Sequence, residues 1–308
     1  MAPPAKVLPP RLLAHAATAL IGACSTIAAA QPVDTSSSQS LANDRPEAWA
    51  MRWLGSTTLL TAFGSAPDAA PWQWNLAVDL GQVPRLSDAQ QRVGFNGTKA
   101  EDLNKSPVFG RVRVGLALPL GMAAELAYTP PLEVDGAKAR NLIAASIGGR
   151  LWSQGPWSLG SRLFGQTGSV RGDFTCAAEL ANVTDRTINP YGCQAPSNDQ
   201  VDLRYVGADL TLAWRTGAWQ LHAGGGAVKT NFRVQVDALT DGVRDRSVLT
   251  SKGNLGYLAA GVRWAIAPQW SVASELLHVP LDVRRAPVYA RESDSLTSVR
   301  LQLRYDLR

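Results

Sequence analysis

Three histidines occur in the chain, and His222 and His278 are the two that lie beyond its first 30 residues. A hydrolase that works by nucleophilic catalysis needs a histidine base within reach of a serine and an acid. His278 is followed closely by Asp282, and Ser247 and Ser295 are the candidate nucleophiles in polar segments. Because the sequence around these residues matches no familiar catalytic motif, we keep a lipid or peptide hydrolase only as the alternative to a protein without enzymatic activity.

Charged side chains form a second set of candidate functional residues. They recur in segments where polar and apolar residues alternate, so they are expected to share the polar face of a sheet. The set comprises Asp79, Arg111, Arg113, Glu125, Arg150, Arg162, Asp209, Arg263, Glu275, Arg300 and Arg304. Carboxylates and guanidiniums on one face would neutralise one another, and a structural ion-pair network is therefore the favoured interpretation. The excess of arginine leaves a narrow anion-favouring path as the alternative.

Neither a metal nor a cofactor is predicted. The sequence lacks the Cys, His and carboxylate spacings of metal sites, and it lacks a glycine-rich phosphate-binding loop. Cys176 and Cys193 lie in one polar segment of a chain that carries an export signal, described next, so we expect a disulfide between them. It would contribute about 3 kcal/mol by the chain-entropy estimate, mostly as local order in its loop.

The first 30 residues have the character of a secretory signal peptide. Lys6 and Arg11 provide a basic start, residues 12–23 are mostly apolar, and the alanines at 28–30 form a small-residue cleavage site. Removing residues 1–30 takes away two positive charges, so the formal net charge falls from +5 to +3. A charge this small gives no reason to expect a nucleic-acid partner.

Cys24 leaves a second processing route open, because the residues before it resemble a lipoprotein signal in which this cysteine would be lipidated.

The segment 31–44 is rich in Ser, Gln and Asp and is predicted to be a disordered linker. A helical segment is expected over 45–68, with a proline in its first turn and with Trp49 and Trp53 one turn apart. This helix would lie at the membrane interface in the periplasm or plug a lumen.

From Trp72 onward the apolar residues recur at every second position, which is typical of β-strands with two different faces. The alternating segments are 72–80, 108–116, 123–128, 142–151, 159–164, 206–213, 219–224, 257–264, 270–276 and 299–307. No apolar run in residues 31–308 is long enough for a transmembrane helix. We therefore predict an all-β domain over 69–308, an antiparallel up-and-down barrel of about ten strands (range 8–12), each near the ~9–11 residues that cross a bilayer.

The connections between these segments alternate in length. Short ones fall at 119–121 and at three turns bracketed by tryptophans, whereas long ones cover 84–106, 172–200, 237–247 and 284–295. Short turns at one end and long loops at the other are typical of outer-membrane barrels, in which the short-turn end is periplasmic. An even number of strands would place both ends of the barrel domain at that end.

Tryptophans mark the short-turn end of the predicted sheet. Their amphipathic rings accumulate at membrane–water interfaces, where they form an aromatic girdle. The predicted girdle consists of Trp72, Trp74, Trp152, Trp157, Trp214, Trp219, Trp264 and Trp270. Trp152 is out of phase with Ile147 and Leu151 on the apolar face, so it is expected in the turn rather than on the lipid-facing surface.

At this point the chain resembles bacterial outer-membrane β-barrel proteins over about residues 72–308. The most specific part is the last strand, Val299–Leu307, which alternates as the closing strand of this class does. The class usually ends on an aromatic residue, whereas Leu307 and Arg308 end this chain. The resemblance implies a Gram-negative outer-membrane location, contact with outer-membrane lipid and dependence on the barrel-assembly machinery.

The favoured function is a non-enzymatic one: a structural or surface-recognition protein whose surface ligand is unknown, or a narrow porin-like conduit for small solutes. Besides the barrel hydrolase, the remaining alternative is a soluble periplasmic β-barrel or lipoprotein that binds an apolar ligand, since such barrels also alternate. In a membrane barrel an arginine near the middle of the lipid-facing surface would cost about 2–4 kcal/mol, so the arginines must face the lumen or lie near the interface.

Overall fold

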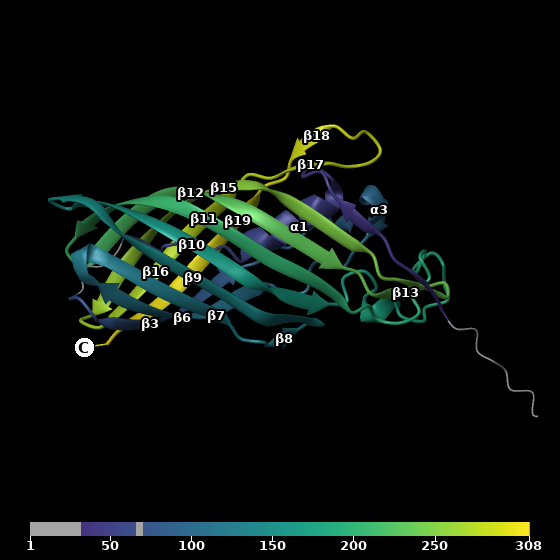
Figure 1. The fold of residues 1–308 in the computed structure, drawn as a ribbon, viewed down its shortest axis with the longest axis horizontal. Helices are drawn as coiled ribbons and strands as arrows, with labels where there is room; N and C mark the ends of the chain where they lie inside the picture. Colours follow the sequence, from purple (N-terminus) through teal and green to yellow (C-terminus); the bar gives the residue numbers. More distant parts are fainter. Residues whose placement is uncertain (1–31, 66–69, 308) are drawn as a thin grey trace, which may run out of the picture. The chain divides into compact units, whose positions relative to one another are not determined.

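Ten long strands close into a barrel in the computed structural model of the chain, which describes residues 32–65 and 70–307 (Figure 1). The predicted signal peptide and Cys24 lie outside these described residues. The strands are β3 (Trp74–Gln82), β6 (Val108–Leu118), β7 (Met122–Thr129), β9 (Ala137–Gln154), β10 (Trp157–Gly172), β11 (Asp199–Thr216), β12 (Trp219–Gln235), β15 (Val248–Ala267), β16 (Trp270–Val279) and β19 (Leu296–Asp306).

Each barrel strand pairs antiparallel with the next one along the chain, and the last strand, β19, pairs with the first, β3. In that closing seam Leu301 lies opposite Leu80, and Gln302 lies opposite Asp79. The arrangement confirms the predicted all-β barrel of ten strands. Because β19 pairs with β3, the first and last strands of the described barrel protect each other's edges where they overlap.

The two faces of the sheet are chemically different. On β3, Leu76, Val78 and Leu80 point away from the lumen and are 46–52% exposed, whereas Ala77 and Asp79 point inward and are buried. A belt of exposed Leu, Val and Ile continues around the other strands. Such a belt is stable only in lipid, so this is a membrane-spanning barrel of the outer-membrane type.

Five strands are longer than predicted. β9, β10, β11, β12 and β15 have 16 to 20 residues each. On β12 the outward residues change from Trp219 and Leu221 at one end to Lys229, Asn231 and Arg233 at the other. The strands therefore continue past the apolar belt into water at the end that carries the long loops, and only their belt portions match the predicted length.

Short elements occupy the connections. They are α2 (Asp88–Gln91), β4 (Arg92–Val93), α3 (Gly94–Gly97), β5 (Lys99–Ala100), η1 (Pro119–Gly121), β8 (Glu133–Val134), η2 (Ala178–Leu180), β13 (Ala238–Thr240), β14 (Val243–Asp245), β17 (Asp282–Arg284) and β18 (Arg291–Ser293). In Figure 1, α3, β13, β17 and β18 gather at one end of the barrel. This is the long-loop end, which in outer-membrane barrels faces outward.

The chain that precedes the helix lies at this outer end. β1 (Val33–Thr35) pairs with β14, and β2 (Ser38–Ser40) pairs with the first residues of β15. β15 extends beyond Leu258, the last residue that pairs with β16, and β2 covers part of the edge left free. The predicted disordered linker over 31–44 was therefore wrong for these residues, because an exposed polar segment can still satisfy its backbone groups along a strand edge.

The helix α1 (Pro46–Thr57) lies inside the barrel toward its outer end (Figure 1). Trp49 and Trp53 are buried with their ring centres 6.5 Å apart, and Gly55 leaves just enough room for the ring of Phe232 on the inner wall. No helix in the described residues is both long and apolar enough to cross a membrane. After α1 the chain runs down the lumen without regular structure to Ser65.

The tryptophans gather at the short-turn end. Trp157 pairs with Trp214, Trp219 stacks on Trp264 at 5.1 Å, and the Trp270 ring lies 4.7 Å from that of Tyr305. Trp72 and Trp74 are also exposed, beside the last residues of β6. These rings belong to the end of the barrel opposite the long loops.

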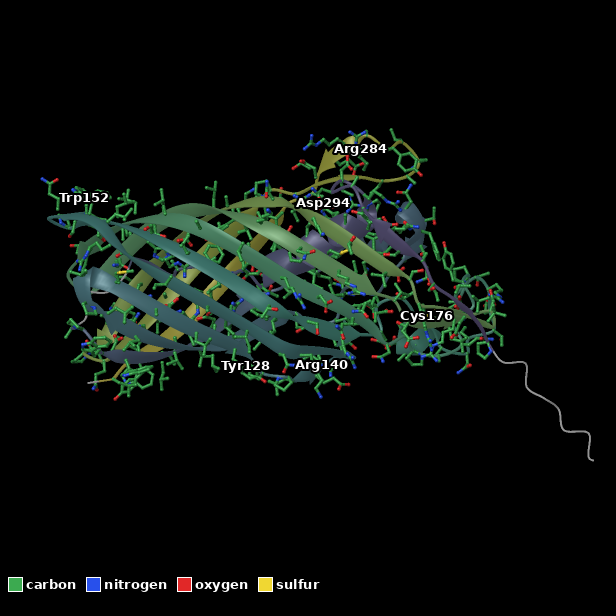
Figure 2. All side chains as sticks on the ribbon, viewed as in Figure 1. Tyr128, Arg140, Trp152, Cys176, Arg284 and Asp294 are labelled. Carbon is green, nitrogen blue, oxygen red and sulfur yellow. A yellow bond between two sulfur atoms is a disulfide. The ribbon has the colours of Figure 1, made fainter. Side chains whose placement is uncertain are left out.

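Trp152 lies in β9 and not in the turn, which corrects the prediction for this residue. It pairs with Leu159, whereas the next pair along β9 is Arg150 with Gly160, so Leu151 is an extra residue in the strand. The bulge restores the phase and leaves the Trp152 ring 45% exposed. Figure 2 shows Trp152 at one end of the barrel and Cys176 at the other.

Candidate functional site: the occupied lumen

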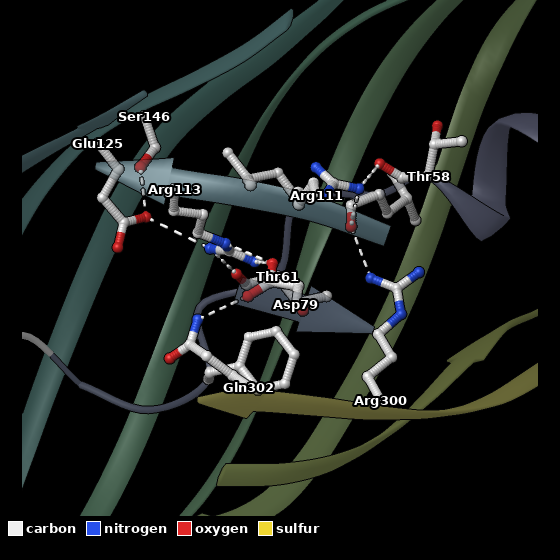
Figure 3. Close-up of polar contacts among 12 residues, drawn as sticks. Thr58, Thr61, Asp79, Arg111, Arg113, Glu125, Ser146, Arg300 and Gln302 are labelled. Carbon is white, nitrogen blue, oxygen red and sulfur yellow. Dashed lines mark hydrogen bonds and ion pairs between the residues drawn. The ribbon is translucent and has the colours of Figure 1, made fainter. Parts of the chain in front are cut away.

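Five arginines from four strands hold the irregular segment 58–65 in the lumen by its backbone. Arg111 on β6 donates to the carbonyl of Thr58 at 2.5 Å, and Arg113 on the same strand donates to that of Thr61 at 2.9 Å (Figure 3). Because the carbonyls of a non-helical segment have no partners of their own, they would be costly to bury without such donors.

Strands β10, β11 and β15 supply further donors. Arg162 on β10 donates to Leu60 at 2.9 Å, and Arg263 on β15 donates to Phe63 at 2.8 Å. Tyr205 on β11 accepts from the Leu60 amide at 3.0 Å and donates to the Thr58 carbonyl at 3.1 Å. The segment is thus bonded around much of the barrel circumference, and we call these contacts, together with those of Arg300 described next, the arginine ladder.

Arg300 on β19 caps the C-terminal end of α1. Its guanidinium donates to the carbonyls of Ser56 at 3.1 Å, Thr57 at 3.0 Å and Leu59 at 2.5 Å. The last carbonyls of a helix lack intrahelical partners and carry the negative end of its dipole, so a buried cation is favourable there. One side chain therefore ends the helix and fixes the start of the irregular segment.

Carboxylates on the wall hold the same arginines from behind. Asp79 pairs with Arg113 at 2.5 Å and accepts from Gln302 at 2.9 Å. Asp209 pairs with Arg162 at 2.6 Å and also accepts from Tyr257 at 2.6 Å. The carboxylate partners fix the guanidinium planes, so that the remaining N–H groups point toward the segment.

The other predicted lumenal charges contact wall residues or the turn end of the barrel. Glu125 lies 3.5 Å from Arg113 and 3.6 Å from Arg162, and it accepts from Ser146 at 3.1 Å. Arg304 pairs with Asp306 at 2.6 Å, and Arg150 lies beside Gly121 at the short-turn end. Glu275 is buried with its carboxylate 3.4 Å from the imidazole of His222.

The arginine excess that suggested an anion path has a different use in this geometry. The guanidiniums that outnumber the carboxylates are directed at backbone carbonyls of the segment 56–63. Below the segment, a polar cavity of only about 60 Å³ remains beside Glu125, Arg263 and Arg304. The segment 58–65 and the side chains bonded to it thus occupy the lumen between α1 and this cavity.

Each candidate residue of the alternative hydrolase has a partner outside the candidate set. His278 points outward between the buried Leu277 and Val279, and its Nδ1 lies 2.9 Å from the Thr297 hydroxyl. Asp282 pairs with Arg291 at 2.5 Å. The candidate serines are engaged elsewhere, since Ser247 donates to Asp245 at 2.5 Å and Ser295 accepts from the Leu281 amide at 3.4 Å.

Across residues 32–65 and 70–307, no group of three His, Cys, Asp or Glu side chains is arranged to hold a metal ion.

The outer loops are cross-linked in several ways. Cys176 and Cys193 form a disulfide with an S–S distance of 1.96 Å, which confirms the predicted pairing. Lys105 pairs with Asp102 at 2.5 Å and with Asp173 at 2.7 Å, which joins two loops. Burial of Lys105 opposes its charge, but the two carboxylates outweigh this effect and raise the pKa of Lys105 above its ordinary value.

Glu101, in the same loop as Lys105, has a largely buried side chain. Burial raises the pKa of Glu101 to about 8, although Lys99 lies 2.8 Å away and favours the ionised form. Desolvation therefore outweighs the ion pair at this carboxylate. The Lys99 ammonium is held in turn by the Thr175 carbonyl.

Sequence reasoning missed the neutral polar residues of the lumen. Gln166 donates to the Thr58 hydroxyl at 2.8 Å, and Gln220 donates to the Ser65 hydroxyl at 3.1 Å. With Tyr205 and Gln302 they occupy inward positions of the predicted strands or of their continuations, so the same period of two identifies them. Their partners in the segment 58–65 carry no comparable pattern, because the bonds are made mainly to backbone atoms.

No protein-family model matches the chain, and neither does any curated protein sequence. Solved structures that it resembles include the outer-membrane protease OmpT from Escherichia coli, with 11% identity, coverage of 82% of this chain and 100% of that chain, and a TM-score of 0.35. Ail of Yersinia pestis has 8% identity, 77% and 100% coverage and a TM-score of 0.30. The Pseudomonas putida toluene transporter TodX has 10% identity, 78% and 90% coverage and a TM-score of 0.33. Likeness at this level carries nothing about activity to this outer-membrane barrel.

Proposed function

We propose that this barrel does not conduct solutes and acts through its outer face, as a structural or surface-recognition protein of the outer membrane. The observation that carries the proposal is the arginine ladder, which fixes the segment 58–65 across the lumen. A barrel of about ten strands has little room beyond its own side chains, and here an additional length of chain occupies that room. Passage of a solute would require breaking several charge-assisted hydrogen bonds at once.

The outer face supports the recognition part of the proposal. The Phe95 ring is 64% exposed and stacks on Tyr191 at 5.8 Å, and Asn96 donates to the Tyr289 hydroxyl at 3.4 Å. Phe95 and Asn96 both have positive φ, which a protein retains only where the surroundings enforce it. Ordered loops that present aromatic side chains on a rigid scaffold are typical of binding surfaces.

Planar-bilayer recording tests the proposal. The full mature chain should insert without conductance steps, whereas a variant that lacks residues 46–65 should show steps of constant size. Arg304→Ala is the matched control, because this lumenal arginine pairs with Asp306 and not with the segment. Regular conductance steps from the unaltered protein would overturn the proposal and favour a conduit.

A further inference from the structure

A cavity of about 260 Å³ lies at the outer end of the barrel, between α1 and the upper wall. Its floor is one side of α1, with Ala50, Trp53 and Leu54. Its wall includes Val201 on β11, Val234 on β12 and Leu249 on β15. The cavity is thus built from the helix, the strand ends above the membrane and the loops, and not from the lipid-facing surface.

The entrance lies on the outer side. Ser37 and Gln39 from the β2 region and Phe95 from α3 belong to the lining, and all three are exposed. The chain before α1 therefore forms one lip of the entrance, and the loop that carries Phe95 forms the other. A molecule arriving from the cell exterior would meet the cavity before it met the arginine ladder.

The carboxylates of the lining already have hydrogen-bond partners. Glu47 pairs with Arg45 at 2.8 Å and accepts from the Asn96 amide at 2.7 Å. Asp199 accepts from the amides of Thr175 at 2.7 Å and Asp237 at 3.0 Å. Glu101 pairs with Lys99. These contacts leave the apolar walls as the recognising surface, and a charged ligand would lose hydration against those walls.

We propose that this outer cavity binds one compact, uncharged apolar molecule. A dry cavity of about 150 Å³ suffices for benzene, and drug-sized ligands need upward of about 300 Å³. The volume of about 260 Å³ lies between these values and therefore suits a molecule of one six-membered ring or slightly more. This inference rests on the proposed function, because it names the chemistry that the outer face would recognise.

Thiol protection tests the proposal on the full chain in lipid nanodiscs. In a Cys24→Ser background, Ala50→Cys places a thiol on the cavity floor, and Leu54→Cys is the second variant should the first fail to fold. The rate of modification by methyl methanethiosulfonate is measured by mass spectrometry, with and without cyclohexane. Ala223→Cys, on the lipid-facing side of β12, is the matched control for partitioning into lipid.

Cyclohexane near ten times its Kd should slow modification at position 50 about tenfold, since about a tenth of the cavities stay empty, and it should leave position 223 unchanged. Cyclohexanecarboxylate, the charged analogue, should not protect. Val201→Trp, which fills the cavity, should abolish the effect of cyclohexane. Equal slowing at both positions, equal protection by the carboxylate, or a thiol that never reacts at either cavity position would overturn the proposal. Conductance of the unaltered protein is a separate measurement, so failure of the proposed function is distinguishable from failure of this one.

Discussion

The guanidinium of Arg300, on the last strand of the barrel, lies 2.5 Å from the carbonyl oxygen of Leu59, just beyond the end of the lumenal helix. The strand that closes the barrel therefore also holds the chain that fills it. Both partners are buried, with Leu59 1% and Arg300 4% exposed. A hydrogen bond of this kind contributes more than one at the surface, because the carbonyl has no access to water as a replacement donor.

Substitution of Arg300 should therefore destabilise the protein. Arg300→Ala leaves the carbonyls of Ser56, Thr57 and Leu59 without this donor, and we expect a loss of about 3 kcal/mol in the free energy of unfolding. Urea-induced unfolding in detergent, followed by tryptophan fluorescence, measures the change. Arg304→Ala should cost about 1 kcal/mol or less, because its partner Asp306 is partly exposed. Equal losses in the two variants would argue against the ladder.

The apolar belt predicts where a charge is tolerated. Leu210 lies at the centre of the outward apolar stretch of β11 and is 52% exposed, so Leu210→Arg would place a cation near the middle of the membrane. We expect a loss of about 2–4 kcal/mol in folding free energy and a reduced yield of the folded form. The matched substitution Asn231→Arg, outward on β12 beyond the belt, should be neutral. A tolerated arginine at 210 would contradict the membrane position of the belt.

The pairing of β1 and β2 with the outer ends of the barrel predicts that the chain before α1 is accessible from the cell exterior. In a Cys24→Ser background, Val33→Cys should react with a membrane-impermeant maleimide on intact cells, since Val33 is 64% exposed. Gln154→Cys, at the end of β9 beside the short turn at the other end, should react only after the outer membrane is permeabilised. The reverse pattern would mean that the long loops face the periplasm.

Glu101 predicts a pH dependence of stability. Its pKa is about 8 in the folded protein and near 4.5 otherwise, so between these values the folded state retains a proton that the unfolded state has released. The free energy of unfolding should therefore fall as the pH rises from about 4.5 to about 8. Urea unfolding at several pH values should show a flatter profile for Glu101→Gln. The exposed Glu133→Gln is the control, and an unchanged slope in Glu101→Gln would contradict the burial of this carboxylate.

Most of the fold could be predicted from the alternation of polar and apolar residues at every second position. Alternating Leu and Asp on β3, or Leu and Arg on β19, predicted both the strand and the lumenal face, because pleated backbone dictates where each side chain points. The position of Trp152 was predicted wrongly, because a single extra residue in the strand reverses the alternation of inward and outward side chains. The local composition does not indicate such a bulge. The outer ends of the long strands were also not predicted. Beyond the membrane the outward face becomes polar, as at Lys229 and Asn231, while the inward face becomes apolar, as at Phe232, so the two faces exchange their character.

The arginine ladder could be predicted only on one side. The inward direction of Arg111, Arg113 and Arg300 followed from their strands, and so did the expectation of carboxylate partners. Their bonds to Thr58, Thr61 and Leu59 did not, because backbone carbonyls are present in every residue and leave no mark in composition. The contacts of the hydrolase candidates could not be predicted from the sequence for a related reason. His278 and Asp282 are close in sequence, but their strand and loop direct them to different partners.

The path of residues 32–65 has a consequence for biogenesis. This stretch enters at the outer end beside β15 and leaves at the turn end to begin β3, and the seam between β3 and β19 then encloses it. A polypeptide rarely threads through a ring that is already sealed. We therefore expect the stretch to lie across the curved sheet before the first and last strands meet, so that the nascent barrel is assembled around its own leading chain and the completed seam then encloses it.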